Sequence, residues 1–330
     1  MKRIDIKRLR EQTIQVVSLF LSSEDIKADD RHIIESAMSL WSTLIPEAGE
    51  SSANGGQEYT IDSKFLTSGL LSCKDTKVRE CFRQCFDHMS TTKETMQLML
   101  LTTLHNELKG IEEYGRSTRE FFGLCKDLLP RVLGKRTPET AADIDKVVTA
   151  LYELVIELLK SHKSTEKRQS VVSDTTLQGL LGVIQTILAA TKEQNDLKKN
   201  LLGLFREKQL LEELLYSCLF YQKGKSEMYH RTDAEHGGPA ACKCATQETR
   251  KTGFKVVHGY LGLLEPHEMV EFLEGSIIPL IKDVQRPKKW RHLPSSKGRV
   301  EQHVGITNLG CICYMISMLQ QLFMVPQFRY

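Results

Sequence analysis

Apolar residues recur at every third or fourth position through most of this chain, and this spacing is what most restricts the folds it can adopt. The clearest run follows Thr137-Pro138-Glu139, where a capping threonine, a first-turn proline and an acidic residue predict the start of a helix. Its apolar positions are Ile144, Val147, Val148, Leu151, Leu154, Val155 and Leu158. This period places them on one helical face, and the polar stretch 161–170 ends the run.

Similar runs precede and follow this helix. They cover residues 14–21, 33–44, 177–188, 197–215, 247–264 and 267–284. In the first run, Ile14, Val17, Leu19, Phe20 and Leu21 are expected to form the apolar face. No strand-like alternation is visible and aromatic residues make up 7% of the chain. We therefore predict an all-α fold, with paired antiparallel helices stacked as a HEAT/armadillo-like solenoid, although no fixed-period repeat is present in the sequence.

A basic, proline-bearing stretch follows the helices and contains Trp290. It lacks the further aromatic residues or amphipathic helix of a nucleic-acid or lipid contact, so a solvated linker is the favoured interpretation. We predict three parts: a helical-array domain at 1–285, a basic linker at 286–303 and a separate segment at 304–330.

The overall charge gives no reason to expect a nucleic acid or membrane partner. The net charge is +3, from 45 basic and 42 acidic residues. The first residues, MKRIDIKRLREQ, contain no apolar core of a secretory signal, and no apolar run reaches the roughly 18 residues of a membrane span. Nine cysteines without such a signal are expected to stay reduced. We therefore expect a cytoplasmic protein, with the nucleus also open to it.

One loop contains candidate metal ligands, namely Cys242, Cys244, His230 and His236. A single residue separates the two cysteines, whereas zinc sites favour two or more. A flexible loop with reduced thiols and surface histidines is the preferred interpretation, and we expect neither a metal nor another cofactor. Cys73, Cys81 and Cys85 lie in or beside apolar helical runs and are expected to act as small buried hydrophobic residues.

The segment from Gly305 to Pro326 passes from polar, glycine-bearing sequence into an apolar helix, with Cys313 at the junction. A helix from Tyr314 to Met324 would place Cys313 at its first turn, where unpaired N–H groups and the helix dipole stabilise a thiolate. Asn308 is an uncharged donor that can face an oxyanion beside the sulfur. From residue types alone, two readings stay open: a reactive cysteine, or an ordinary turn leading into a buried helix.

This segment resembles the cysteine box of the ubiquitin-specific proteases, written G-L-x-N-L-G-N-T-C-Y-M-N-S-x-L-Q. The residues that match in register are Gly305, Asn308, Leu309, Gly310, Cys313, Tyr314, Met315, Ser317, Leu319 and Gln320. The sequence after the box, and the stretch from Trp290 to Pro294 before it, are most similar to the large fat-facets-type members, which carry long helical arrays ahead of the protease domain.

The resemblance implies that residues 304–330 are the start of a papain-like cysteine protease domain. It implies that Cys313 is the nucleophile and that Asn308 stabilises the oxyanion. The reaction would be hydrolysis after the C-terminal glycine of ubiquitin through a thioester, helped by a histidine base and an Asp or Asn that orients it. The implied partners are ubiquitin and ubiquitinated proteins, with further protein partners along the helical array.

Departures from the family pattern leave a second hypothesis open. The family's Asn and Thr before the cysteine are Cys311 and Ile312 here, and the Asn after Met is Ile316. No histidine follows Cys313, the last being His303. We therefore expect a truncated portion of a deubiquitinase that is inactive by itself. The alternative is a non-catalytic helical scaffold with a degenerate cysteine box.

Overall fold

The computed structural model describes residues 5–23, 25–45, 61–93, 95–166, 172–220, 242–283 and 313–329. Every regular element within these ranges is helical, which confirms the predicted all-α class. The chain divides into two compact units, Met1–Pro266 and His267–Tyr330. The predicted linker at 286–303 lies outside the described residues, so the predicted domain boundaries stay a prediction.

The elements of the first unit follow one another with short connections. They are α1 (Ile6–Leu21), α2 (Ala28–Leu44), α3 (Ser63–Thr67) with the π-helical turn η2 (Ser68–Ser72), α4 (Thr76–Thr92), α5 (Thr95–Glu107) with the 3₁₀ segment η3 (Leu108–Thr118), α6 (Arg119–Gly134), α7 (Ala141–Ser161), α8 (Thr175–Ala190), α9 (Asn195–Glu207), α10 (Leu210–Glu212) with the π-helical η4 (Glu213–Leu219), and α11 (Gln247–Leu261).

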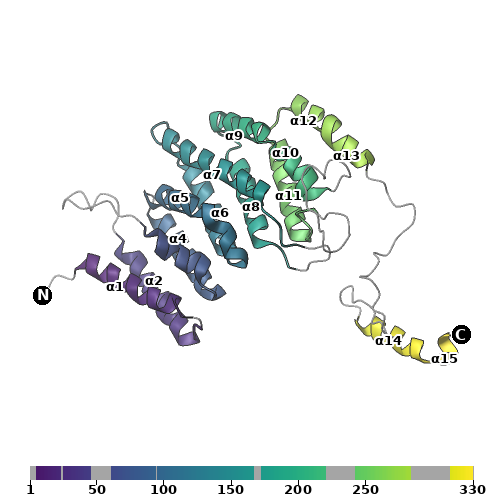
Figure 1. Ribbon diagram of the computed structural model, residues 1–330. Coiled ribbons are helices and arrows are strands. Elements are labelled where there is room, and N and C mark those ends of the chain that lie inside the picture. The colour runs from purple at the N-terminus through teal and green to yellow at the C-terminus, as the bar shows by residue number, and fades with distance from the viewer. Residues whose placement is uncertain are drawn as a thin grey trace. The chain divides into compact units, whose positions relative to one another are not determined.

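These helices alternate between two layers (Figure 1). In one layer α2, α4, α6, α8 and α11 pack against one another in that order. In the other, α5 contacts α7 and α7 contacts α9. The layers are joined because α1 packs on α2, α5 on α6, and α7 on α8. Each helix therefore buries one stripe against its own layer and another against the facing layer.

Polar side chains at the helix starts explain several of the boundaries. Asp5, Asp62 and Asp75 accept hydrogen bonds from backbone N–H groups in the first turns of α1, α3 and α4. Asp174 does the same for α8 through Leu177 N–H, at 2.9 Å. Such caps satisfy N–H groups that have no partner inside the helix.

Two of the expected helical runs are divided differently in the structure. The expected start of α7 at Thr137 is wrong: residues 138–140 form a turn, Ala141 N–H bonds to Thr137 O at 2.8 Å, and the helix begins at Ala141. The run 197–215 is broken at Gln209, whose φ of 46° is left-handed and cannot continue an α-helix.

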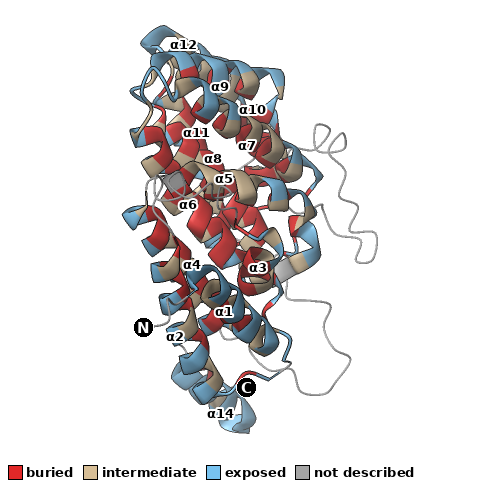
Figure 2. Ribbon diagram, turned by 90° about the vertical axis from the view of Figure 1, so that its left-hand side faces the viewer, coloured by how far each residue is buried: buried red, intermediate tan, exposed pale blue. Residues whose placement is uncertain are grey.

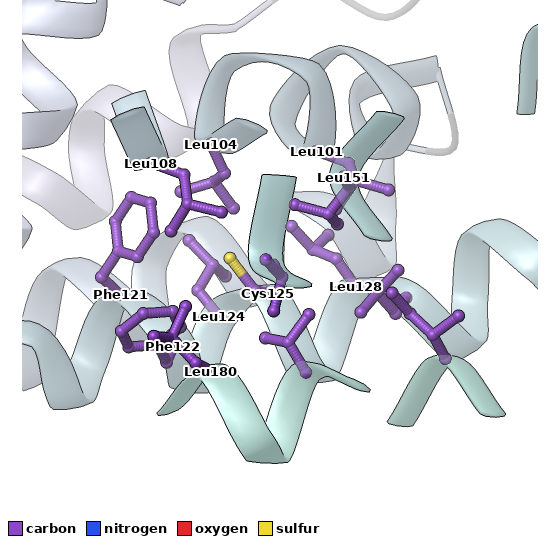
Figure 3. Packing of buried hydrophobic residues seen from close by; sticks show 14 of the residues in the cluster. Leu101, Leu104, Leu108, Phe121, Phe122, Leu124, Cys125, Leu128, Leu151 and Leu180 are labelled. Atoms are coloured by element: carbon purple, nitrogen blue, oxygen red, sulfur yellow. The ribbon is translucent and has the colours of Figure 1, made fainter. Parts of the chain in front are cut away.

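The apolar residues of both layers form one continuous core. Figure 3 shows its middle, where Leu104 and Leu108 meet Phe121 and Leu124 of α6 around the buried Cys125. Figure 2 shows the buried residues concentrated where the two layers face each other. Leu19 is an exception to the predicted pattern, being 74% exposed while Val17 is fully buried. Residues two positions apart in a helix differ by about 200° around its axis, so Val17 and Leu19 cannot lie on the same face.

The segment before α11 is attached to the array by buried polar contacts. The Glu166 carboxylate accepts hydrogen bonds from the N–H groups of Ala245 and Thr246, each at 2.7 Å, and from the Thr249 hydroxyl at 2.8 Å. It also accepts from Asp174 N–H at 2.8 Å. A single buried carboxylate thus fixes both the start of α8 and the approach to α11.

The second unit contains the predicted helical stretch 267–284 and the terminal segment. Its elements are α12 (Pro266–Phe272), the π-helical η6 (Leu273–Ile277), α13 (Ile278–Asp283), α14 (Cys313–Met324) and α15 (Pro326–Arg329). Among the helices of the described residues, none combines the length and the apolar character needed to cross a lipid bilayer.

Candidate functional site

Cys313 is the first residue of α14, which confirms the predicted helix from about Tyr314 to Met324. Its side chain is exposed. The N–H groups of a helix's first turn lack intrahelical acceptors, so this position carries the positive end of the helix dipole. An accessible sulfur in this place can attack an electrophilic carbon.

A side-chain hydrogen bond adds to the backbone bonds of the first turns of α14. The Ser317 hydroxyl donates to Cys313 O at 2.9 Å. Ser317 is one of the residues that matches the cysteine box, and its bond closes the turn that carries the thiol. Ile316, which replaces a family asparagine, is the buried residue of α14. An apolar side chain at this position is therefore accommodated by burial.

The remaining parts of the expected site cannot be placed around the thiol. Asn308, Gly305, Cys311 and Ile312 lie outside the described residues, so the assignment of Asn308 to the oxyanion stays a prediction. Within the part of the chain that the structure describes, no histidine or carboxylate is hydrogen-bonded to the Cys313 sulfur. The described geometry therefore supplies a candidate nucleophile without an orienting base.

The other cysteines have a different environment. Burial raises the pKa of Cys125 to about 12, of Cys85 to about 12 and of Cys81 to about 11. Cys73 is buried, and Cys81 and Cys85 are half-buried against the core, with the Cys85 thiol donating to Met38 O at 3.3 Å. These thiols pack as small apolar groups, as the sequence predicted.

The loop that carries the candidate metal ligands is only partly described, since His230 and His236 lie outside the described residues. Cys244 is fully buried, which corrects the expectation of a flexible loop at this position. Its N–H bonds to Cys218 O at 3.1 Å, and its thiol, together with burial, raises the pKa of the Cys218 thiol. No cluster of three or more His, Cys, Asp or Glu side chains with the geometry of a metal site occurs among the described residues.

A cavity of about 360 Å³ lies between η3, the end of α7 and the start of α8. Its buried His162 bonds through Nε2 to Asp174 at 2.9 Å, while Nδ1 lies 3.7 Å from Glu112. A histidine beside a carboxylate could suggest a general base. Here one ring nitrogen is bonded to Asp174 and the other faces Glu112, so the histidine is placed between two carboxylates and not against a nucleophile. The pair joins the end of α7 to the cap of α8, and no local sequence pattern indicated it.

Fold and site together define a helical-array protein with a candidate thiol nucleophile at the start of a separate helix. Comparison with known proteins shows which proteins the chain is similar to. No protein-family model and no solved structure matches the chain. It is 26% identical over 312 residues to ubiquitin carboxyl-terminal hydrolase 9X of Mus musculus, covering 88% of this chain and 11% of that protein.

Two further relatives are also named as ubiquitin carboxyl-terminal hydrolases. Ubiquitin carboxyl-terminal hydrolase 9Y of Homo sapiens is 25% identical over 93% of this chain and 12% of its own length. Ubiquitin carboxyl-terminal hydrolase puf of Drosophila melanogaster is 26% identical over 67% of this chain and 5% of its own length. The chain is therefore related to the ubiquitin-specific proteases. It spans about a tenth or less of the length of these relatives.

Proposed function

We propose that the chain is part of a ubiquitin carboxyl-terminal hydrolase in which Cys313 is the nucleophile. The observation that carries the proposal is the exposed thiol on the first residue of α14, inside a sequence that matches the family's cysteine box. The kinship with hydrolases of this class supports it independently. The proposed partners are ubiquitin and ubiquitinated proteins. The proposed location is the cytosol or the nucleus, where thiols remain reduced.

In the proposed reaction the Cys313 sulfur attacks the carbonyl carbon of the C-terminal glycine of ubiquitin. A C–S bond forms, the negative charge on the carbonyl oxygen is stabilised by the Asn308 side chain, and the C–N bond breaks as the amine leaves with a proton. Water then hydrolyses the thioester and regenerates the thiol. Proton transfer to the amine needs a histidine, and the sequence has none after Cys313. We therefore propose that the 330-residue chain has little turnover by itself.

A ubiquitin probe with a C-terminal electrophile tests the assignment. It reports bond formation at sulfur without requiring turnover. We expect weak covalent labelling of the 330-residue chain, located at Cys313 by peptide mass spectrometry, and none of Cys313→Ala. Cys311→Ala is the matched control, because it removes a thiol two residues away. Labelling that persists in Cys313→Ala, or that is lost in Cys311→Ala alone, would remove Cys313 from its role.

A scaffold function is the second proposal, in which the array binds protein partners and the cysteine box is degenerate. The replacements Cys311, Ile312 and Ile316 favour it, as does the share of the chain taken by the helices of the first unit. The consecutive packing of α2, α4, α6, α8 and α11 supports a HEAT/armadillo-like solenoid as its form. Failure of the ubiquitin probe to label the chain, together with retained binding of a partner, would favour the scaffold over the hydrolase.

A further inference from the structure

Charged residues at the seam between α4 and α6 are used within the fold. Arg79 lies 3.1 Å from Glu120 in a buried pair. Arg83 lies 2.6 Å from Asp127. Asp87 lies 2.7 Å from Arg131. Every one of these cations has a carboxylate partner across the seam, so this part of the layer offers little unpaired charge to a ligand.

The seam between α6 and α8 and the seam between α8 and α11 are different. Arg119 and Lys126 on α6, and Lys251, Lys255 and His258 on α11, form no ion pair with a carboxylate among the described residues, although the Asp127 carboxylate lies near enough to Lys126 to raise its pKa. All are exposed except Lys126, which is half-buried. We call these five residues the basic face. Their charge does not serve to join the helices of this layer.

The basic residues of α11 point away from the rest of the fold. Lys251, Lys255 and His258 are spaced by four and three residues, so they share one helical face. Glu248 precedes them on this face, and its carboxylate accepts a hydrogen bond from the Ser173 hydroxyl at 2.5 Å. Other faces of α11 are occupied: Gly259 packs on Leu188 of α8, and Tyr260 stacks on Phe205 of α9 with ring centroids 3.9 Å apart. The stripe that remains is the outer surface of the layer.

Lys126 approaches the same surface from the other side of α8. A Cβ added at Gly182 would lie 3.1 Å from Lys126 Cδ, so the lysine stem lies across this glycine. Along the seam, Thr118 bonds to Thr176 near the helix starts and Phe122 packs on Gly179. These contacts advance together along both chains, so α6 and α8 run in the same direction.

α8 lies between the basic row of α6 (Arg119 and Lys126) and the basic row of α11 (Lys251, Lys255 and His258), and it carries no charge at all. Thr175–Ala190 contains no ionisable residue, and its side chains that reach solvent include Gln178, Gln185 and Thr186. Amide and hydroxyl groups offer both donors and acceptors to a bound polypeptide. The two charged rows therefore border a neutral, hydrogen-bonding strip.

The position of Lys126 is unfavourable for the isolated fold. Burial lowers its pKa, the Asp127 carboxylate opposes this shift, and the guanidinium groups of Arg83 and Arg119 add to it. Because Asp127 is already paired with Arg83, a further anion would stabilise the half-buried ammonium of Lys126. This is a second sign that the surface is made for a partner.

We propose that the basic face binds an acidic segment of a partner protein, which lies along α8 with carboxylates directed to Arg119 and Lys126 on one side and to Lys251, Lys255 and His258 on the other. Packed helices are about 8–10 Å apart, so the rows on α6 and α11 are separated by roughly 16–20 Å. A helix is about 10–12 Å wide with its side chains and fits between them. The neutral strip on α8 contains no aromatic side chain on which the bases of a nucleic acid could stack, so it suits an acidic polypeptide better than a single strand.

This inference rests on the proposed role of the helical array in binding protein partners, and it names acidic segments as the kind of partner that is bound. The surface does not involve Cys313. Labelling of Cys313 by the ubiquitin probe is expected to be the same in the variants below. The two proposals can therefore fail separately.

Fluorescence anisotropy with a labelled oligo-glutamate peptide and the full 330-residue chain tests the surface. Exposed ion pairs each contribute modestly, so we expect Arg119→Gln/Lys126→Gln and Lys251→Gln/Lys255→Gln each to weaken binding about 3- to 10-fold, and the fourfold variant about 10- to 100-fold. Binding should also weaken as salt is raised. The matched control is Lys192→Gln/Lys199→Gln, which removes the same charge from exposed positions elsewhere.

Three outcomes would overturn the proposal. The first is an equal loss in the control variant, since binding would then follow net charge rather than this surface. The second is tighter binding of labelled oligothymidylate than of oligo-glutamate, since the face would then select nucleic acid. The third is no binding of oligo-glutamate at low salt. Thermal unfolding of each variant verifies that the substitutions leave the fold intact.

Discussion

The buried ammonium of Lys243 lies 2.7 Å from the carboxylate of Glu213, so the segment before α11 is tied to η4 by an ion pair within the protein interior. The same ammonium donates to Leu159 O at 2.6 Å and to Lys160 O at 2.9 Å. These carbonyls belong to the last turn of α7, where acceptors lack intrahelical donors and the dipole favours a cation. One side chain thereby joins α7, η4 and the approach to α11.

Replacing Lys243 with methionine should be strongly destabilising. The substitution leaves the Glu213 carboxylate buried without its partner, and breaking a buried pair in this way costs about 3–5 kcal/mol. Urea unfolding followed by circular dichroism measures the change. Adding Glu213→Gln to Lys243→Met should recover part of the loss, because the second substitution removes the unpaired charge.

The control for this pair is Lys208→Met. Lys208 and Glu157 form an exposed ion pair at 3.1 Å, for which water can substitute. We expect its free energy of unfolding to remain near that of the unmodified protein. Equal destabilisation by both methionine variants would show that burial of Lys243 is not what matters.

Asp174 should make the free energy of unfolding depend on pH in the acidic range. Burial alone would raise the pKa of this carboxyl, but the hydrogen bond from His162 and the N–H groups of Leu177 and Thr165 bring it well below its usual range. A folded-state pKa below the unfolded one contributes stability above the unfolded pKa and loses it as the pH falls. We expect the difference in unfolding free energy between the protein and Asp174→Asn to shrink as the pH drops below about 4. Asp143→Asn, at an exposed position early in α7, serves as the control.

Gly179 should not tolerate a side chain. A Cβ there would lie 2.0 Å from Phe122 Cδ2 of α6, so Gly179→Ala must displace a fully packed ring. Overpacking of this kind costs about 1–3 kcal/mol. Gly203→Ala in α9 has nothing within 4 Å of the new methyl and should stabilise by up to about 1 kcal/mol through helix propensity. Differential scanning calorimetry should show opposite shifts in Tm, and a neutral Gly179→Ala would contradict the close packing of α6 on α8.

Cys313 should be alkylated much faster than the thiols of the core. Its side chain is exposed, whereas Cys125 is buried with its pKa raised to about 12. Because the thiolate is the reactive form, iodoacetamide at pH 8 should modify Cys125 more than about 100-fold more slowly. Peptide mass spectrometry over time measures both sites in one sample, and unfolding in urea should bring their rates together. Similar rates in the folded protein would contradict the exposure of Cys313.

The helical fold could be predicted because its evidence is local. The spacing of Ile144, Val148, Leu151 and Val155 follows the turn of a helix, and these residues are buried in α7. The ends of helices were less predictable: Thr137 and Pro138 look like a helix start, yet the structure uses them in a turn before Ala141. Competing turn geometries share the same capping residues, so the sequence does not choose between them.

For the candidate site, the sequence supplied the residue types and their order, and α14 begins at the expected cysteine. Asn308 is a prediction that the described residues do not test. What no local pattern reveals is which distant groups meet. Glu166 and Thr246 are 80 residues apart in the sequence and are joined by hydrogen bonds. His162 forms a buried pair with Asp174 and also faces Glu112, which lies on a different element.

The sequence by itself determined the all-α class, the position of Cys313 at a helix start and the kinship with ubiquitin-specific proteases, because helical period and motif register are written in consecutive residues. Only the tertiary structure decided which charges are neutralised. Arg83 is paired with Asp127 across a helix seam, while Lys126, the chain neighbour of Asp127, forms no ion pair among the described residues. Pairing depends on distances between helices that are far apart in the chain, and such distances are set by how side chains such as Phe122 fit against Gly179.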